Sequence, residues 1–157
     1  MKYSPVLLAI LLTTALQAGS LPLGYFQQEV KYDIDVKLDD KDHILRGHEK
    51  LLYMNNSPNS IDFIWMHLWP NAYKDNNTAF AKQMWENGRS KFYFSDEDDR
   101  GYIDSLNFTI KGVPLQVEAH PEWIDVVKLI LPAPLAPGKR ITIETPFKVK
   151  IPIVFSR

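Results

Sequence analysis

The amino-acid sequence predicts a mostly β domain, arranged as an antiparallel saddle-like sandwich or open sheet of about seven or eight strands with one short helical insertion. Three observations predict this fold class. Apolar and polar residues alternate in several stretches, turn-forming residues separate those stretches, and one segment alone shows helical spacing. The length of 157 residues suits one domain, and 45% hydrophobic with 24% charged residues is ordinary globular composition.

The first strands are predicted from the spacing of apolar residues. Residues 30–38 place apolar side chains on one face and charged ones on the other, which predicts a half-buried strand. Residues 44–54 continue the pattern after the polar turn at 39–42, so these two strands are expected to pair as a hairpin. Residues 61–69 form a nearly continuous apolar run, stopped by Pro70, which predicts a strand covered on both faces.

The helical insertion is expected within residues 70–102, where the strand pattern stops. Asn77 is the expected N-cap of a short helix over residues 78–86, which Asn87 and Gly88 would end. Apolar side chains four residues apart give this segment one apolar stripe.

Strand patterning then resumes. The expected strands are residues 106–110, 113–117, 123–131, 141–143 and 147–151. Lys111 and Gly112 form a tight turn between the first two of these, and a Pro-Ala-Pro sequence at 132–134 ends the third. Pro146 and Pro152 suggest an edge strand or a bulge, because proline cannot donate to the hydrogen-bond ladder of a sheet.

The N-terminus is predicted to be a secretory signal peptide at residues 1–18, followed by a linker at 19–24 and a single domain at 25–157. A lysine near the start precedes the apolar residues 6–16, and Ala18 is the small residue before the expected cut. The apolar stretch is too short to cross a bilayer as a helix. We therefore expect an exported chain, periplasmic or extracellular, with no membrane span after cleavage; the alternative is a buried N-terminal helix.

Composition removes several classes of function. The chain has no cysteine, which excludes disulfides, thiolate zinc sites and thiol nucleophiles. Its formal net charge is -1, so there is no basic excess to neutralise phosphates, and nucleic acid is not an expected partner. No serine lies in a nucleophile-elbow sequence, and the sequence has no glycine-rich phosphate loop.

Two short motifs begin like metal sites and then depart from them. His48-Glu49 begins the zinc-protease motif His-Glu-x-x-His, but Leu52 stands where the second histidine should be, and the segment is a predicted strand. The acidic residues 96–99 begin like a calcium loop, but Arg100 occupies a ligand position. We expect polar strand residues and a solvated acidic turn at these places.

The tryptophans and three asparagines allow two interpretations each. The tryptophans are Trp65, Trp69, Trp85 and Trp123. Exposed coplanar rings would form a platform for a sugar or a peptide, whereas tryptophans in alternating strands also fill sandwich cores, the interpretation we favour. Asn55, Asn76 and Asn107 begin glycosylation acceptor sequences, which matter only in a eukaryotic secretory pathway. Pro58 disfavours modification of the first of these.

Three stretches, at 32–73, 92–112 and 131–152, carry a family resemblance through their order along the chain. The first is a hairpin leading into a hydrophobic strand, the second holds the acidic turn, and the third contains Pro-Leu-Ala-Pro-Gly before a final strand. In these stretches the chain resembles the N-terminal β domain of the aminopeptidase N-like zinc metallopeptidases (gluzincins), and most closely an exported bacterial branch. The resemblance covers about residues 25–157.

The resemblance implies a non-catalytic domain that packs on a thermolysin-like catalytic domain and helps to form a peptide-substrate cleft. The family's zinc helix and its substrate-anchoring motif would follow Arg157, so we expect no catalytic, cofactor-binding or metal-binding residue in this chain, and zinc only in the catalytic domain. The expected partners are that catalytic domain and, through the whole enzyme, a peptide substrate. The alternative is an independent secreted β-sandwich module that binds sugar or peptide.

The C-terminal residues 151–155 are an apolar run, which predicts an unpaired strand edge there and self-association of the isolated domain. On this expectation, Ile153→Lys combined with Phe155→Lys makes the chain more monomeric without unfolding it.

Overall fold

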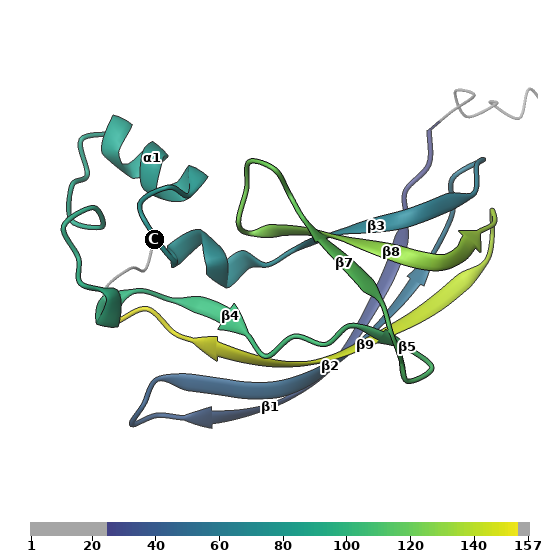
Figure 1. Ribbon diagram of the computed structural model, residues 1–157, viewed down its shortest axis with the longest axis horizontal. Helices are drawn as coiled ribbons and strands as arrows, with labels where there is room; N and C mark the ends of the chain where they lie inside the picture. The colour runs from purple at the N-terminus through teal and green to yellow at the C-terminus, as the bar shows by residue number, and fades with distance from the viewer. Residues whose placement is uncertain (1–24, 154–157) are drawn as a thin grey trace, which may run out of the picture.

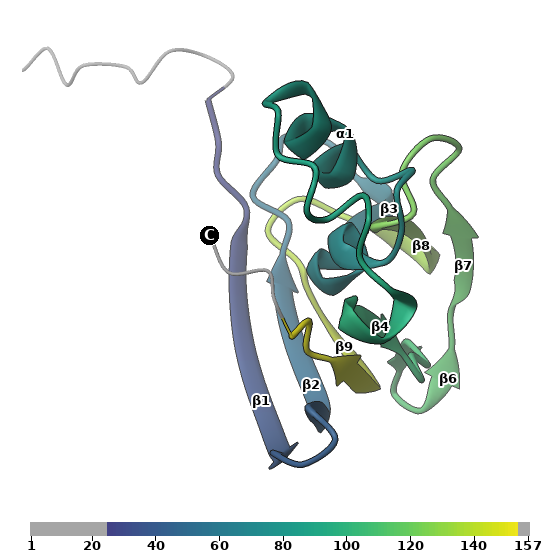
Figure 2. The ribbon, with the colours of Figure 1, turned by 90° about the vertical axis from the view of Figure 1, so that its left-hand side faces the viewer.

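A computed structural model describes residues 25–153 of the protein and confirms the predicted fold class (Figure 1). The predicted signal peptide at 1–18, the linker at 19–24 and Phe155 lie outside the described residues. Two antiparallel sheets face each other, and a mostly helical insertion lies at one end of them (Figures 1 and 2). In the described part of the chain, no helix is long and apolar enough to cross a membrane.

The larger sheet has the strand order β1-β2-β9-β5-β6, with β4 pairing on β9 as well. Its strands are β1 (Glu29–Asp39), β2 (Ile44–Met54), β4 (Tyr102–Asp104), β5 (Thr109–Ile110), β6 (Val113–Pro114) and β9 (Arg140–Lys150). The smaller sheet has the order β3-β8-β7, made of β3 (Ile61–His67), β7 (Gln116–Ala119) and β8 (Val126–Leu135).

The predicted hairpin is confirmed as β1 and β2, which pair without a register shift from Glu29↔Met54 to Asp39↔Ile44. The Asp39 side chain begins the turn by accepting hydrogen bonds from the next backbone N–H groups, those of Lys41 and Asp42. The second predicted turn is also confirmed, because Lys111 and Gly112 both have positive φ, as a two-residue hairpin turn requires.

The core lies between the two sheets. Its buried apolar members are Leu51, Ile64, Leu68, Phe108, Leu129, Leu131, Leu135 and Ile143. At one end, the fully buried Asn55 ties the sheets together: its Nδ2 donates to the carbonyl oxygens of Asn59 and Leu135 at 2.8 and 2.7 Å. The Asn55 Oδ1 accepts hydrogen bonds from the backbone N–H and hydroxyl of Ser57. This buried amide therefore has its hydrogen bonds satisfied.

The prolines do not end strands or mark edges where the sequence predicts it. Pro146 lies inside β9, a central strand, at the gap between the residues paired with β4 and the residue paired with β5. Pro132 and Pro134 lie inside β8, where its pairing with β3 shifts register. In both places the strand lacks a regular neighbour on one side, so the missing N–H of proline interrupts no continuous ladder.

The strand β3 corrects a second prediction. Its inner side chains Ile64 and Met66 meet the core, but Phe63 and Trp65 on the other face are exposed. The strand is therefore covered on one face only, and its outer face is aromatic rather than polar.

The insertion contains a 3-10 helix η2 (Trp69–Tyr73), the helix α1 (Ala79–Glu86) and a 3-10 turn η3 (Glu97–Asp99). The N-cap of α1 is Thr78, one residue later than predicted, because the Thr78 hydroxyl accepts the N–H of Ala81 at 3.1 Å. Asn87 follows as the C-cap and Gly88 has a positive φ, as predicted for the end of this helix.

As far as residue 153, the C-terminal segment is not the unpaired strand edge that the sequence predicts for residues 151–155. The Ile151 N–H donates to the carbonyl oxygen of His43, and the Ile153 N–H donates to that of Asp99. The long unpaired edge among the described residues belongs to β1 instead, which pairs only with β2.

Candidate functional site

The candidate site begins on the outer face of β3. Phe63 and Trp65 alternate with the buried Ile64, so both rings project away from the core. His120 and Trp123, from the loop that joins β7 to β8, continue the same surface. These four side chains, Phe63, Trp65, His120 and Trp123, are called the aromatic face.

The rings of the aromatic face form one continuous series of contacts. The Phe63 and Trp65 centroids lie 5.8 Å apart, edge to face, and the Trp65 and His120 centroids lie 5.2 Å apart. His120 and Trp123 are stacked with centroids 4.7 Å apart and planes 5° from parallel. Both edge-to-face and parallel contacts are favourable geometries for aromatic pairs. The series therefore holds four rings in defined positions at the surface.

Backbone hydrogen bonds fix the position of His120. Its Nδ1 accepts the N–H groups of Glu122 and Trp123 at 3.1 and 3.2 Å. An imidazole nitrogen that accepts hydrogen bonds carries no proton, so the neutral ring has its proton on Nε2. The His120 backbone N–H also donates to the Val126 carbonyl oxygen at 3.2 Å. The loop is thus closed on itself, and the Trp123 ring is held against His120.

One charged pair borders the aromatic face. Lys128 of β8 places its Nζ 4.5 Å from the Phe63 ring centroid and 3.5 Å from the Glu118 carboxylate. A cation over an aromatic ring is attracted by the negative charge of the ring face. The border thus supplies a charged hydrogen-bond donor and a charged acceptor beside the rings.

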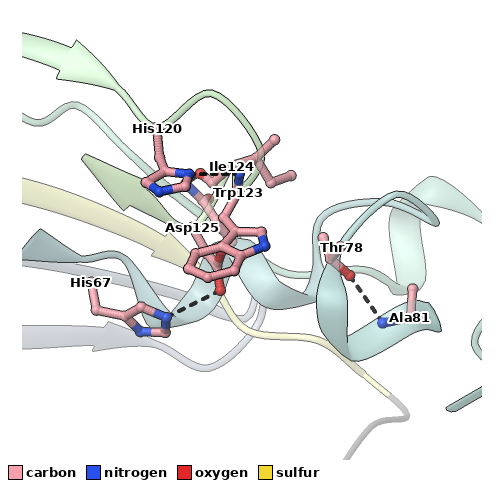
Figure 3. A network of polar contacts seen from close by, with 8 residues as sticks. His67, Thr78, Ala81, His120, Trp123, Ile124 and Asp125 are labelled. Carbon is pink, nitrogen blue, oxygen red and sulfur yellow. Dashed lines mark hydrogen bonds and ion pairs between the residues drawn. The ribbon is translucent and has the colours of Figure 1, made fainter. Parts of the chain in front are cut away.

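A histidine–aspartate pair lies next to the aromatic face (Figure 3). His67, the last residue of β3, places Nε2 3.2 Å from Oδ2 of Asp125, whose side chain is only 12% exposed. The Asp125 main chain is fixed as well, because its carbonyl oxygen accepts the Leu68 N–H. The His67 Nδ1 is buried and makes no hydrogen bond with the described residues. The Trp69 ring covers the imidazole edge to face, with centroids 3.8 Å apart.

A groove of about 1110 Å³ runs from this pair along the helical insertion. Its apolar lining comes from the insertion and from the end of the larger sheet: Trp69, Pro70, Ala72, Tyr73, Ala79, Phe80, Met84, Val149, Ile151 and Pro152. Its polar lining is His67, Lys82, Gln83, Glu86 and Asp125. No serine, threonine or cysteine is among these lining residues.

A second surface lies on the larger sheet. Alternate residues of β1 form an apolar strip along one face of the sheet, and each is 38–58% exposed: Val30, Tyr32, Ile34, Val36 and Leu38. These residues are called the β1 strip. The prediction of a half-buried strand is therefore correct for the pattern and wrong for the burial, because no described segment covers the apolar face of β1.

Two ionisable groups with raised pKa values lie at the β1 strip: Tyr32, which belongs to it, and Glu49 next to it. Glu49 of β2 lies opposite Ile34, and burial raises the pKa of its carboxyl above the ordinary value of 4.5. Burial, and then the charge of Glu49, raise the pKa of the Tyr32 hydroxyl above its ordinary value of 10.0. The partial burial of a carboxylate within an apolar surface disfavours its charged form.

His48 and Glu49, which begin like the zinc-protease motif, lie next to each other on β2. Because side chains alternate along β2, His48 and Glu49 point to opposite faces, opposite Asp35 and Ile34 respectively, and cannot share an ion. Among the described residues, no group of three or more His, Cys, Asp or Glu side chains could hold a metal.

The acidic turn holds the insertion onto the sheet. Asp98 lies 3.6 Å from Lys150, and Lys150 also donates to the Glu97 carbonyl oxygen. Arg100 turns away from the acids and donates to Ser95 and Asn76 instead. The acidic residues are thus solvated, as predicted, and the arginine organises the loop.

All four tryptophans are exposed, between 48 and 69%, which contradicts the favoured prediction that they fill the core. They do not form one platform. Trp65 and Trp123 belong to the aromatic face, Trp69 covers His67, and Trp85 forms a separate cluster with Tyr93 and Phe94. A strand with an exposed aromatic face and a strand buried on both faces have similar amino-acid compositions. Composition alone therefore cannot tell an exposed tryptophan of β3 from a buried one.

Sequence reasoning also missed the His67–Asp125 pair and the groove. One signal was present: Phe63, Trp65 and His67 share one face of a strand by period-two spacing. The partner residues Asp125 and His120 lie more than fifty positions away, and only the pairing of β3 with β8 brings them together.

Comparison of the chain with protein-family models and with curated proteins finds no match.

Proposed function

We propose that the protein is a non-catalytic β domain of an exported zinc aminopeptidase-like metallopeptidase, where it packs on a catalytic domain and helps to form the peptide-substrate cleft. The location that this implies is periplasmic or extracellular. The observation that carries the proposal is the β1 strip, whose apolar residues alternate as they do in a covered strand and are nevertheless exposed. Exposed apolar surface of this extent is typical of interaction sites.

Two exposed apolar surfaces support a docking role. Contacts between domains of one protein usually bury about 600–1,500 Å² and are partly apolar. The β1 strip and the apolar lining of the groove are the surfaces that would contribute to such a contact.

The first test is the genomic DNA that follows the codon for Arg157. A continuing frame that encodes a His-Glu-x-x-His helix is the expected result, and the absence of such a helix contradicts the proposal. The encoded downstream segment is then produced separately and titrated with this chain by calorimetry.

The docking face is tested with the double variant Val36→Asp and Leu38→Asp. Placing two charges in an apolar contact is expected to weaken binding to the downstream segment by at least about tenfold, since unpaired buried charges are costly. Lys41→Asp is the matched control, because it changes the net charge by the same amount in the exposed turn beyond β1. Equal weakening by both variants would mean that charge, and not the apolar strip, determines binding.

A second candidate function is supported by the aromatic face. Four surface rings in contact, bordered by Lys128 and Glu118, are suited to stack on a sugar ring or an aromatic peptide side chain. We propose this as the function of the chain if it acts as an independent secreted module.

Its test is a fluorescence titration with soluble β-linked glucose oligosaccharides and with tryptophan-containing peptides. Trp65→Ala is expected to abolish binding, whereas Trp85→Ala, in the separate aromatic cluster, leaves it unchanged. Binding that survives Trp65→Ala would exclude the aromatic face as the site.

A further inference from the structure

The free edge of β1 lacks most of the features that normally prevent strands of different molecules from pairing. The strand is 11 residues long, has no proline, glycine or bulge, and pairs with β2 alone among the described residues. Proteins usually protect such an edge with short strands, prolines, bulges or charged side chains, above all charges that point inward. Of these devices β1 has only charged side chains, and they all lie on the face opposite the apolar β1 strip.

The two faces of β1 limit how a second copy could pair with this edge. Apolar residues occupy the even-numbered positions and charged residues the odd-numbered positions throughout the strand. When two copies of an antiparallel edge meet around a twofold axis, residues directly opposite each other lie on the same face of the sheet. Apolar residues then meet apolar residues, and the charged residues decide which register is favourable.

The register that pairs the whole strand is electrostatically unfavourable. With the axis at Ile34, each pair of opposing charged residues has the same sign: Glu29 with Asp39, Lys31 with Lys37, and Asp33 with Asp35. Like charges directly opposite each other destabilise a sheet.

Moving the axis by one residue reverses most of these interactions. With the axis at Asp33, Lys31 meets Asp35 and Glu29 meets Lys37, each twice by symmetry, and only the two Asp33 residues repel. With the axis at Asp35, Lys31 meets Asp39 and Asp33 meets Lys37, and the two Asp35 residues repel.

Neighbouring residues decide between these two registers. Asp33 lies opposite Lys50 of β2, so a lysine, which also pairs with Glu144 at 3.2 Å, stands beside the repelling pair when the axis is at Asp33. With the axis at Asp35, the corresponding neighbour is His48. The second register also needs Asp39, whose carboxylate already accepts two backbone N–H groups of the turn. The first register has the better local compensation.

We propose that two copies of this chain pair through the free edges of β1, antiparallel, with the twofold axis at Asp33. The pairing joins the larger sheets of the two copies into one continuous sheet. It places Val30 opposite Val36 and Tyr32 opposite Ile34, so the two β1 strips form one apolar surface. The contact uses the edge of β1 and not its apolar face, so it stands independently of the proposed docking function.

The first measurement is sedimentation equilibrium of the chain over a range of concentrations. A reversible monomer–dimer equilibrium is expected. A chain that remains monomeric at the highest soluble concentration overturns the proposal.

The register is tested with Lys31→Asp and Asp35→Lys. Each variant alone turns the two Lys31–Asp35 attractions into repulsions, so each is expected to weaken the dimer by at least about tenfold. An equimolar mixture of the two variants is expected to dimerise again, because a heterodimer pairs Asp with Lys at every one of these positions. Lys41→Asp and Asp40→Lys, in the turn beyond the strand, are the matched controls and are expected to leave dimerisation unchanged.

Each other outcome identifies a different geometry. Stronger dimers from both single variants place the axis at Ile34, and an unaffected Asp35→Lys variant places it at Asp35; either result overturns the proposed register. Dimers that neither variant affects form through another surface, which overturns the proposal as a whole. Circular dichroism and thermal unfolding of every variant confirm that the hairpin is intact, since positions 31 and 35 face solvent.

Discussion

The strands β1 and β3 differ in opposite ways from what their sequences predict. The alternating sequence of β1 predicts one covered face, yet that face is exposed along its whole length. The nearly continuous apolar sequence of β3 predicts two covered faces, yet only its inner face meets the core. A pattern of apolar residues therefore identifies which side chains avoid water, but not whether this chain itself covers them. In both strands, the apolar residues left exposed are the ones that form the candidate binding surfaces.

The largest expected effect comes from the same substitution made in both strands. Ile64 of β3 is buried in the core, whereas Ile34 of β1 is exposed. Ile64→Ala is expected to lower the free energy of unfolding by about 2–4 kcal/mol, because it removes buried methyl groups and leaves a cavity. Ile34→Ala is expected to lower it by no more than about 1 kcal/mol. Urea unfolding at a dilute concentration measures both, and equal losses would show that β1 is covered after all.

A smaller effect is expected on the outer face of β3. Trp65→Ala removes two ring contacts but no core packing, so we expect a loss of about 1–2 kcal/mol of unfolding free energy. Phe63→Ala is expected to have a similar effect, because its ring also contacts Trp65 and Lys128. Thermal unfolding of both variants gives the comparison. A loss as large as that of Ile64→Ala would mean that the aromatic face is part of the core.

The smallest effect concerns the pH dependence of the surface beside β1. Burial raises the pKa of Glu49 in the folded chain, so the folded state binds this proton more tightly than the unfolded state does. Below the unfolded value of 4.5 both states are protonated, and the stabilisation is complete. It is lost as the pH rises through the raised folded pKa, because the folded state must then hold a partly buried charge.

Glu49→Gln removes this dependence. The unfolding free energy of the variant, relative to the original chain, is expected to rise as the pH passes from the unfolded value of 4.5 through the raised folded pKa, and to stay constant above it. Urea titrations across this range measure the difference, with Asp40→Asn in the exposed turn as the control for removing a carboxyl group. A difference that does not change with pH would mean that Glu49 is not buried enough to matter.

Local sequence predicts the elements of this fold well and the covering of their faces poorly. The β1–β2 hairpin, the Lys111-Gly112 turn and the helix at 79–86 depend on neighbouring residues and were predicted to within a residue or so. The strand β4 was missed because it has three residues, too few for a period to be visible. The sequence does not predict that Pro132, Pro134 and Pro146 lie inside strands. A strand accommodates proline at these positions because the neighbouring strand is not regularly paired there.

The candidate site was less predictable than the fold. Exposure of Trp65 and Trp123, and the pairing of His67 with Asp125, are set by contacts between segments far apart in the sequence. Phe63, Trp65 and His67 alternate along the sequence and so share one face of β3. Because the residues between them are also apolar, the segment reads as one continuous apolar run, which is typical of a strand buried on both faces.

The buried Asn55 has a consequence for how the protein can be made. Asn55-Asn56-Ser57 is a glycosylation acceptor sequence, but the Asn55 side chain is wholly enclosed and its nitrogen donates to two carbonyl oxygens. A sugar attached to that nitrogen would replace one of its two N–H donors, and so one of these hydrogen bonds, and could not fit inside the domain. In a eukaryotic secretory host, folding and glycosylation would compete for the Asn55 side-chain nitrogen. A chain modified there could not reach the folded structure. Production without that modification machinery leaves the amide free to join the two sheets.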